Sequence, residues 1–115
     1  GLLRLDATGA VVARAPSVGG VVALTADPRL AGGVWAADRA VRRVVLVAGD
    51  GSVAAELREF LAPSSIAVAP DGAELWIADA GSGRITRQTR EGAVLARSTG
   101  LSGPVTVTVA FAPAP

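Results

Sequence analysis

The sequence has 115 residues, of which half are apolar and 18% are charged, and eleven Arg face ten acidic residues for a net charge of +1. It contains no Cys and no His, which excludes disulfides, thiolate metal sites and the commonest general base. The balanced charge and the presence of only two Trp and two Phe argue against a nucleic-acid-binding domain, and no apolar run is long enough to cross a membrane as a helix.

Short apolar runs bounded by Gly, Pro and Asp predict β-strands along most of the chain. The stretch 51–63 comes nearest to an amphipathic helix, but its counterpart at 92–104 is a poor helix former, so the strand interpretation is kept. Around strand 84–89, the alternate residues Arg84, Thr86, Gln88 and Arg90 are polar, a pattern typical of the solvent face of an outer strand. In chain order, the predicted strands lie at 2–6, 10–14, 21–25, 34–37, 43–48, 52–57, 65–69, 74–78, 84–89, 93–98 and 104–111.

The strand pattern repeats along the chain. Residues 34–40 (VWAADRA) overlay residues 75–81 (LWIADAG), and the offset between Trp35 and Trp76 is 76 minus 35, or 41 residues. A partial third copy at 2–11 overlays 44–53 with an offset of 42. A period of roughly 40–45 residues with strand-only content predicts four-stranded propeller blades.

This period divides the chain into units whose strands are lettered a to d. We expect a half blade at 1–15 (strands c and d), complete blades at 21–57 and 65–98, the first strand of a further blade at 104–111, and a linker-like tail at 112–115. The predicted fold class is therefore all-β, with four-stranded antiparallel blades in an incomplete ring, because a closed ring needs about four to eight blades. We expect polypeptide outside residues 1–115, from other chains or from the same protein, to pair with both ends.

The repeat resembles the NHL-type β-propeller repeat and its relative, the YVTN-type repeat. The resemblance covers most of the chain and implies a propeller fold, whereas it implies no particular activity because propellers host many functions. The YVTN-type likeness favours an extracytoplasmic, periplasmic or secreted location. The residues that carry the resemblance are Pro63, Ile66, Ala67, Val68, Pro70, Asp71, Gly72, Leu75, Trp76, Ile77, Ala78, Asp79, Arg84, Ile85 and Gly92.

Several acidic and glycine residues recur at fixed positions of the repeat. Asp38 and Asp79 each follow strand b, where a carboxylate closes the b–c turn by accepting backbone N–H groups, and a ligand role is the alternative. Trp35 and Trp76 are interpreted as packing between blades, with stacking on a sugar or a base as the alternative. The predicted structural turn residues are Asp38, Asp79, Asp71, Gly72, Gly51 and Gly92.

Four arginines are the candidate binding residues. Arg39, Arg42, Arg43 and Arg84 lie in or beside the b–c connections, where their guanidinium groups could recognise a carboxylate or a phosphate. Because Asp38 and Asp79 are close by in sequence, surface ion pairs are the alternative interpretation of the same residues.

The sequence favours a non-enzymatic binding or scaffold module that presents loops for protein–protein interaction or assembly. The alternative is a fragment of a metal-dependent propeller hydrolase or lyase whose ligands lie mostly on missing blades. Propeller enzymes that resemble the gluconolactonase family hold a divalent cation with Glu, Asn and Asp, and this chain has no Asn. We therefore assign no catalytic residue, no metal ligand and no cofactor from the sequence.

Overall fold

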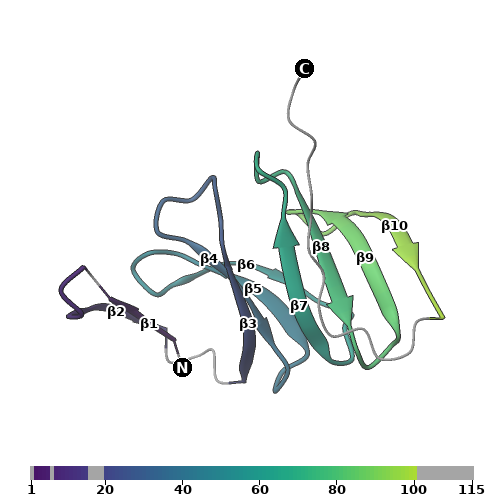
Figure 1. The fold of residues 1–115 in the computed structure, drawn as a ribbon, viewed down its shortest axis with the longest axis horizontal. Coiled ribbons are helices and arrows are strands. Elements are labelled where there is room, and N and C mark those ends of the chain that lie inside the picture. The colour runs from purple at the N-terminus through teal and green to yellow at the C-terminus, as the bar shows by residue number, and fades with distance from the viewer. Residues whose placement is uncertain (1, 6, 16–19, 101–115) are drawn as a thin grey trace.

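The computed structural model describes residues 2–5, 7–15 and 20–100, and within them it contains ten strands and no helix (Figure 1). The strands form three antiparallel sheets, in which each strand pairs with its neighbour in sequence. They are the N-terminal hairpin of β1 (Leu2–Leu5) and β2 (Val11–Ala15); the middle sheet of β3 (Val21–Ala26), β4 (Val34–Asp38), β5 (Arg43–Val47) and β6 (Val53–Leu57); and the C-terminal sheet of β7 (Pro63–Val68), β8 (Glu74–Asp79), β9 (Arg84–Thr89) and β10 (Val94–Ser98).

The all-β, four-stranded prediction is confirmed. Each strand begins and ends within two residues of its predicted position, because Gly, Pro and Asp punctuate the apolar runs so densely. The middle and C-terminal sheets supply strands a to d in order, and the N-terminal hairpin supplies strands c and d. The predicted strand at 104–111 and the tail at 112–115 lie outside the described residues.

The sheets stack face to face, and the main core lies between the middle and C-terminal sheets (Figure 1). Because side chains alternate between the two faces of a strand, Trp35 and Ala37 of β4 point to the C-terminal sheet. They pack against Ile66 of β7 and against Leu75 and Ile77 of β8. The core thus joins two successive units of the repeat.

A second core joins the N-terminal hairpin to the middle sheet. Ala36, Val45 and Val47 project from the other face of the middle sheet and are buried with Ala15 of β2. The c–d turn of the middle sheet approaches the hairpin closely at Gly51, where a Cβ atom would collide with the backbone carbonyl of Arg14. Gly51 also has a φ of 91°, so both the contact and the backbone conformation favour glycine.

Candidate functional site

The carboxylate of Asp79 ties together two connections of the C-terminal sheet. It accepts hydrogen bonds from the backbone N–H groups of Leu61 at 2.9 Å and Ala62 at 2.8 Å, which lead into strand a. It also accepts one from Gly81 at 3.1 Å, in the b–c turn. Burial raises the pKa of Asp79, but the hydrogen bonds from Ala62 and Leu61 outweigh it, so the pKa lies below its usual value.

Asp38 repeats this arrangement in the middle sheet. Its Oδ1 atom accepts hydrogen bonds from the backbone N–H of Ala40 at 3.1 Å, in the b–c turn, and from that of Gly20 at 3.2 Å, just before strand a. The structure therefore places both repeated aspartates, each only 1% exposed, at the ends of β4 and β8, where they accept hydrogen bonds from the b–c turns. The additional link to the segment before strand a was not predicted from the sequence.

The other turn residues lie at the opposite ends of the strands. The side chain of Asp71 accepts a hydrogen bond from the backbone N–H of Ala73 at 2.9 Å, within the a–b turn that also contains Gly72. Gly51 and Gly92 occupy equivalent c–d turns, with φ of 91° and 101°. These positive values lie where a side chain is disfavoured.

The four candidate arginines have different surroundings. Arg43 forms an ion pair with Glu56 at 2.6 Å, and the Nε of Arg84 donates to the hydroxyl of Ser82 at 3.1 Å. Arg39 and Arg42 are exposed in the b–c turn of the middle sheet. Arg39 and Arg42 lie in one turn, Arg43 begins the strand after it and Arg84 begins β9 of the next sheet, so their anion-binding role stays a prediction.

The two tryptophans share a position in the repeat but not an environment. Trp35 is fully buried against the C-terminal sheet, in keeping with packing between units. Trp76 points from the opposite face of the C-terminal sheet and is half-buried, and the guanidinium of Arg87 lies over its ring at 5.7 Å.

A buried ion pair was missed by sequence reasoning. Arg90, in the c–d turn of the C-terminal sheet, donates two hydrogen bonds to the carboxylate of Asp27, at 3.0 and 2.8 Å, in the a–b turn of the middle sheet. Arg90 also donates to the backbone carbonyl of Gly72 at 2.6 Å and lies 5.7 Å from the ring of Trp35. The hydrogen bonds from Arg90 hold the pKa of Asp27 below its usual value.

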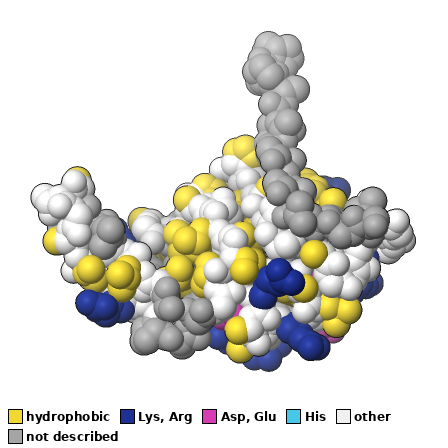
Figure 2. Space-filling view, turned by 60° about the horizontal axis from the view of Figure 1, so that its bottom comes forward, with side chains coloured by type: hydrophobic (Ala, Val, Ile, Leu, Met, Phe, Trp, Pro, Cys, Tyr) yellow, Lys and Arg dark blue, Asp and Glu magenta, His cyan; other side chains and the backbone are white. Residues whose placement is uncertain are grey.

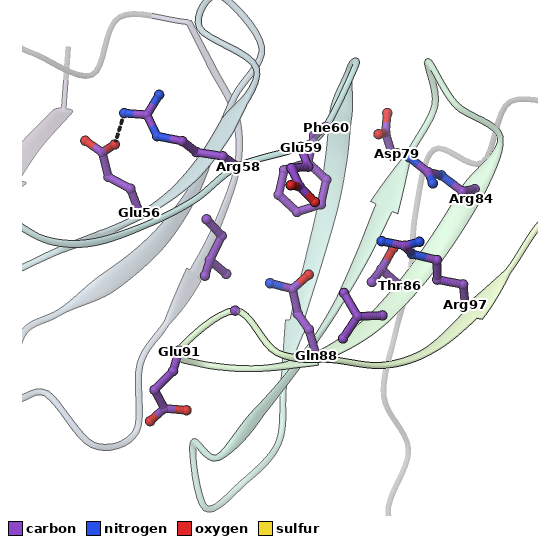
Figure 3. Close-up of a pocket in the computed structure, with 13 residues that line it drawn as sticks. Glu56, Arg58, Glu59, Phe60, Asp79, Arg84, Thr86, Gln88, Glu91 and Arg97 are labelled. Carbon is purple, nitrogen blue, oxygen red and sulfur yellow. Dashed lines mark hydrogen bonds and ion pairs between the residues drawn. The ribbon is translucent and has the colours of Figure 1, made fainter.

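A cleft of about 300 Å³ lies between the outer strands of the middle and C-terminal sheets (Figure 3). We call it the polar cleft. Leu57 of β6 and Phe60 of the following connection line one wall, and Thr86, Gln88 and Arg97 of β9 and β10 line the other. The prediction that the Thr86–Gln88 side of β9 faces solvent is wrong, because both residues are buried against the neighbouring sheet.

A second hollow, of about 260 Å³, lies between the N-terminal hairpin and the middle sheet. We call it the apolar groove. Leu2 and Arg4 of β1 line one side, and Leu24, Val34 and Gly51 line the other. Figure 2 shows hydrophobic side chains gathered between the projecting hairpin at the left and the rest of the molecule.

Comparisons with known proteins identify the fold. No protein-family model and no curated protein matches the sequence. The chain is similar to hydrazine synthase of Kuenenia stuttgartiensis, at 19% identity over 80% of this chain and 26% of that one, with a TM-score of 0.69. It is also similar to AztD of Citrobacter koseri, at 14% identity over 76% of this chain and 26% of that one, with a TM-score of 0.62. A streptogramin B lyase is similar at 19% identity over 90% of this chain and 36% of that one, with a TM-score of 0.68.

These three structures are propeller-type proteins. The chain has a β-propeller fold. Its blades do not close a ring, and the chain spans 26% to 36% of the length of these neighbours. Within the described ranges, no helix could span a membrane. Nor do three or more His, Cys, Asp or Glu side chains lie together as a possible metal site in this part of the chain.

Proposed function

We propose that this chain is a non-enzymatic binding and scaffold segment of an NHL-like propeller, and that it assembles with polypeptide outside residues 1–115. The observation that carries the proposal is the apolar groove, whose counterpart on the C-terminal sheet is filled by a strand of this chain. A groove of this kind recognises polypeptide through backbone pairing and apolar contacts. The YVTN-type resemblance supports an extracytoplasmic location for this module.

The repeat makes the covered and uncovered faces directly comparable. On the C-terminal sheet, the face of β7 and β8 that points to the middle sheet is covered, and Ile66 is only 8% exposed. On the middle sheet, the corresponding face of β3 and β4 points to the N-terminal hairpin, and Leu24 is 54% exposed. Full burial of such a side chain contributes roughly 1.5–3 kcal/mol, so covering this strip is favourable.

The covered copy also indicates what the occupant is. The inner face of the C-terminal sheet is covered by β4 of the middle sheet, through Trp35, and β4 itself pairs with β5. Strand β1 corresponds to β5 in the repeat. A polypeptide that fills the apolar groove in the way β4 covers the C-terminal sheet would therefore pair with the open edge of β1. Arg4 corresponds in the repeat to Arg87, which lies opposite Trp76 and over its ring. We therefore expect a two-stranded hairpin with an aromatic residue opposite Arg4.

The buried carboxylates support a structural use of the polar residues. Asp38 and Asp79 accept backbone N–H groups, and Asp27 accepts the guanidinium of Arg90. Each of these groups therefore holds a connection or joins two blades through its hydrogen bonds, and within the described residues only the Oδ2 atom of Asp38 is left without a partner among them. This arrangement favours a binding and assembly role over catalysis.

The test is to supply the missing hairpin as a peptide. A synthetic peptide with the sequence of residues 20–39, added to the full chain, is expected to shift the backbone amide resonances of β1 and of Leu24 and Val34. It should also raise the melting temperature with increasing concentration. The matched control is the same peptide carrying Trp35→Ala, which should bind at least about tenfold more weakly because a buried aromatic contact is lost.

Two outcomes would contradict the proposal. One is that neither peptide binds, or that both bind equally well. The other is a saturable rise in melting temperature with Ca²⁺, Zn²⁺ or Mn²⁺, which would favour the hydrolase or lyase alternative. A Leu24→Glu variant of the full chain provides a further control, since Leu24 is exposed and its replacement should abolish peptide binding without unfolding the protein.

A further inference from the structure

Two residues of β9 that line the polar cleft differ from their equivalents in the preceding blade. With the offset of 41, Thr86 and Gln88 of β9 correspond to Val45 and Val47 of β5. The two valines are buried in an apolar core with Ala15. The same backbone positions therefore face a packed interior in one blade and a hollow in the next.

Thr86 and Gln88 are largely buried residues whose side chains make no hydrogen bond to another described residue. Thr86 is 6% exposed and Gln88 is 4% exposed. Neither side chain makes a hydrogen bond within the part of the chain that the structure describes, and both line the cleft. The side chains line the open cleft, so a molecule bound there could accept hydrogen bonds from, or donate them to, the hydroxyl of Thr86 and the amide of Gln88. The arrangement points to a polar ligand as the missing partner.

The strand register places positive charge beside these groups. Arg97 of β10 lies directly opposite Thr86 of β9, so the two side chains share the face that lines the cleft. Arg84 lines the same wall and uses its Nε atom to reach Ser82. Figure 3 shows the side chains of Arg97, Thr86 and Gln88 grouped on one side of the cleft.

The acidic residues around the cleft are largely engaged or directed elsewhere. Glu56 is neutralised by ion pairs with Arg43 and Arg58, both at 2.6 Å. The carboxylate of Asp79 accepts backbone N–H groups. Figure 3 shows Glu91 pointing away from the other lining side chains, and Glu59 lies across the cleft, beside Phe60. The wall formed by β9 and β10 is thus the cationic side.

We propose that the polar cleft binds a small organic carboxylate. Its carboxylate group would accept hydrogen bonds from the guanidinium groups of Arg97 and Arg84, which match a planar anion. The amide of Gln88 would bind a further polar atom, and the carbon skeleton would pack on Leu57 and Phe60. A volume of about 300 Å³ is at the lower end for ligand sites, which fits a small molecule. This proposal does not rest on the assembly role proposed above.

The test uses the full chain and a panel of acetate, succinate, glutamate and benzoate, with succinamide as a neutral control. At least one carboxylate is expected to bind saturably and to shift the side-chain amide resonances of Gln88, whereas succinamide should not. The double variant Thr86→Val/Gln88→Val gives β9 the two valines that β5 carries at these positions. It should weaken binding about tenfold or more, because hydrogen bonds to a charged ligand are lost.

Two single variants complete the design. Arg97→Gln should also weaken binding about tenfold, and Arg87→Gln on the opposite face of β9 should leave it unchanged. A melting temperature for each variant shows that the fold is retained, since Arg97 is exposed. The proposal is overturned if no carboxylate of the panel binds, or if the double valine variant binds within about twofold of the natural chain.

Discussion

The ion pair between Asp27 and Arg90 should be the most important polar contact between two blades. Replacing Arg90 with Gln removes both hydrogen bonds to the Asp27 carboxylate, together with the donor to the carbonyl of Gly72 and the contact with the ring of Trp35. The side chain of Asp27 is 0% exposed and that of Arg90 is 15% exposed. The variant therefore leaves a buried carboxylate without its cation, which typically costs about 3–5 kcal/mol.

The chain offers a matched control for this experiment. Arg87 also pairs with a carboxylate, that of Glu74, and also lies 5.7 Å from a tryptophan ring. Its side chain is 44% exposed and that of Glu74 is 27% exposed. Because water screens this pair, Arg87→Gln should lower the free energy of unfolding much less than Arg90→Gln does. Urea unfolding at neutral pH measures both losses.

The pH dependence separates loss of charge pairing from loss of packing. In the natural chain, Arg90 lowers the pKa of Asp27, so the resulting stabilisation is present at neutral pH and is lost as the pH falls below about 4. In Arg90→Gln, the carboxylate loses the largest interaction that offsets its burial and keeps only the hydrogen bonds from Leu30 and Trp35, so the pKa of Asp27 rises relative to the natural chain. The difference between the two proteins should therefore shrink as the pH falls through this range. An equal loss at every pH, or one no larger than that of Arg87→Gln, would refute the reasoning.

Two further predictions concern the connections. Asp79→Ala should lower the free energy of unfolding by about 2 kcal/mol, since it leaves the N–H groups of Leu61 and Ala62 without their acceptor. Urea unfolding measures this loss, and an unchanged free energy of unfolding would contradict the prediction. Gly51→Ala should detach the N-terminal hairpin, seen as faster amide exchange in residues 2–15, because the new Cβ collides with Arg14. Gly92→Ala is the matched control, because Gly92 also has a positive φ but a Cβ atom there would not collide with the backbone. This variant should leave amide exchange in the N-terminal hairpin unchanged.

The strands and their turns could be predicted because the relevant signals are local. A Pro-Asp-Gly or Gly-Asp-Gly sequence between apolar runs defines a turn within a few residues, and the offset of 41 then aligns Asp38 with Asp79. The ion pair of Asp27 and Arg90 could not be predicted in this way. Its partners are 63 residues apart, and each lies in a turn where a charged residue ordinarily faces solvent.

The solvent-face interpretation of β9 was wrong for a related reason. Alternation of polar and apolar residues identifies the two faces of a strand, but it does not say which face another sheet covers. In β9, the polar side with Thr86 and Gln88 is the covered one, and Arg87 is on the exposed side. The polar cleft was therefore hidden from sequence reasoning, although comparison with Val45 and Val47 in the preceding repeat carried the signal.

That comparison has a consequence for the stability of the chain. Val45 and Val47 show that the repeat accommodates apolar residues at these positions, where they pack tightly with Ala15. Thr86 and Gln88 place polar side chains at the same positions, so they bury less apolar surface than the valines of the preceding repeat do. Destabilising residues of this kind concentrate where function requires them. The double valine variant should thus be at least as stable as the natural chain, while it no longer binds the carboxylate ligand. A binding site predicts both results together, whereas a mere packing defect predicts only the unchanged or higher stability.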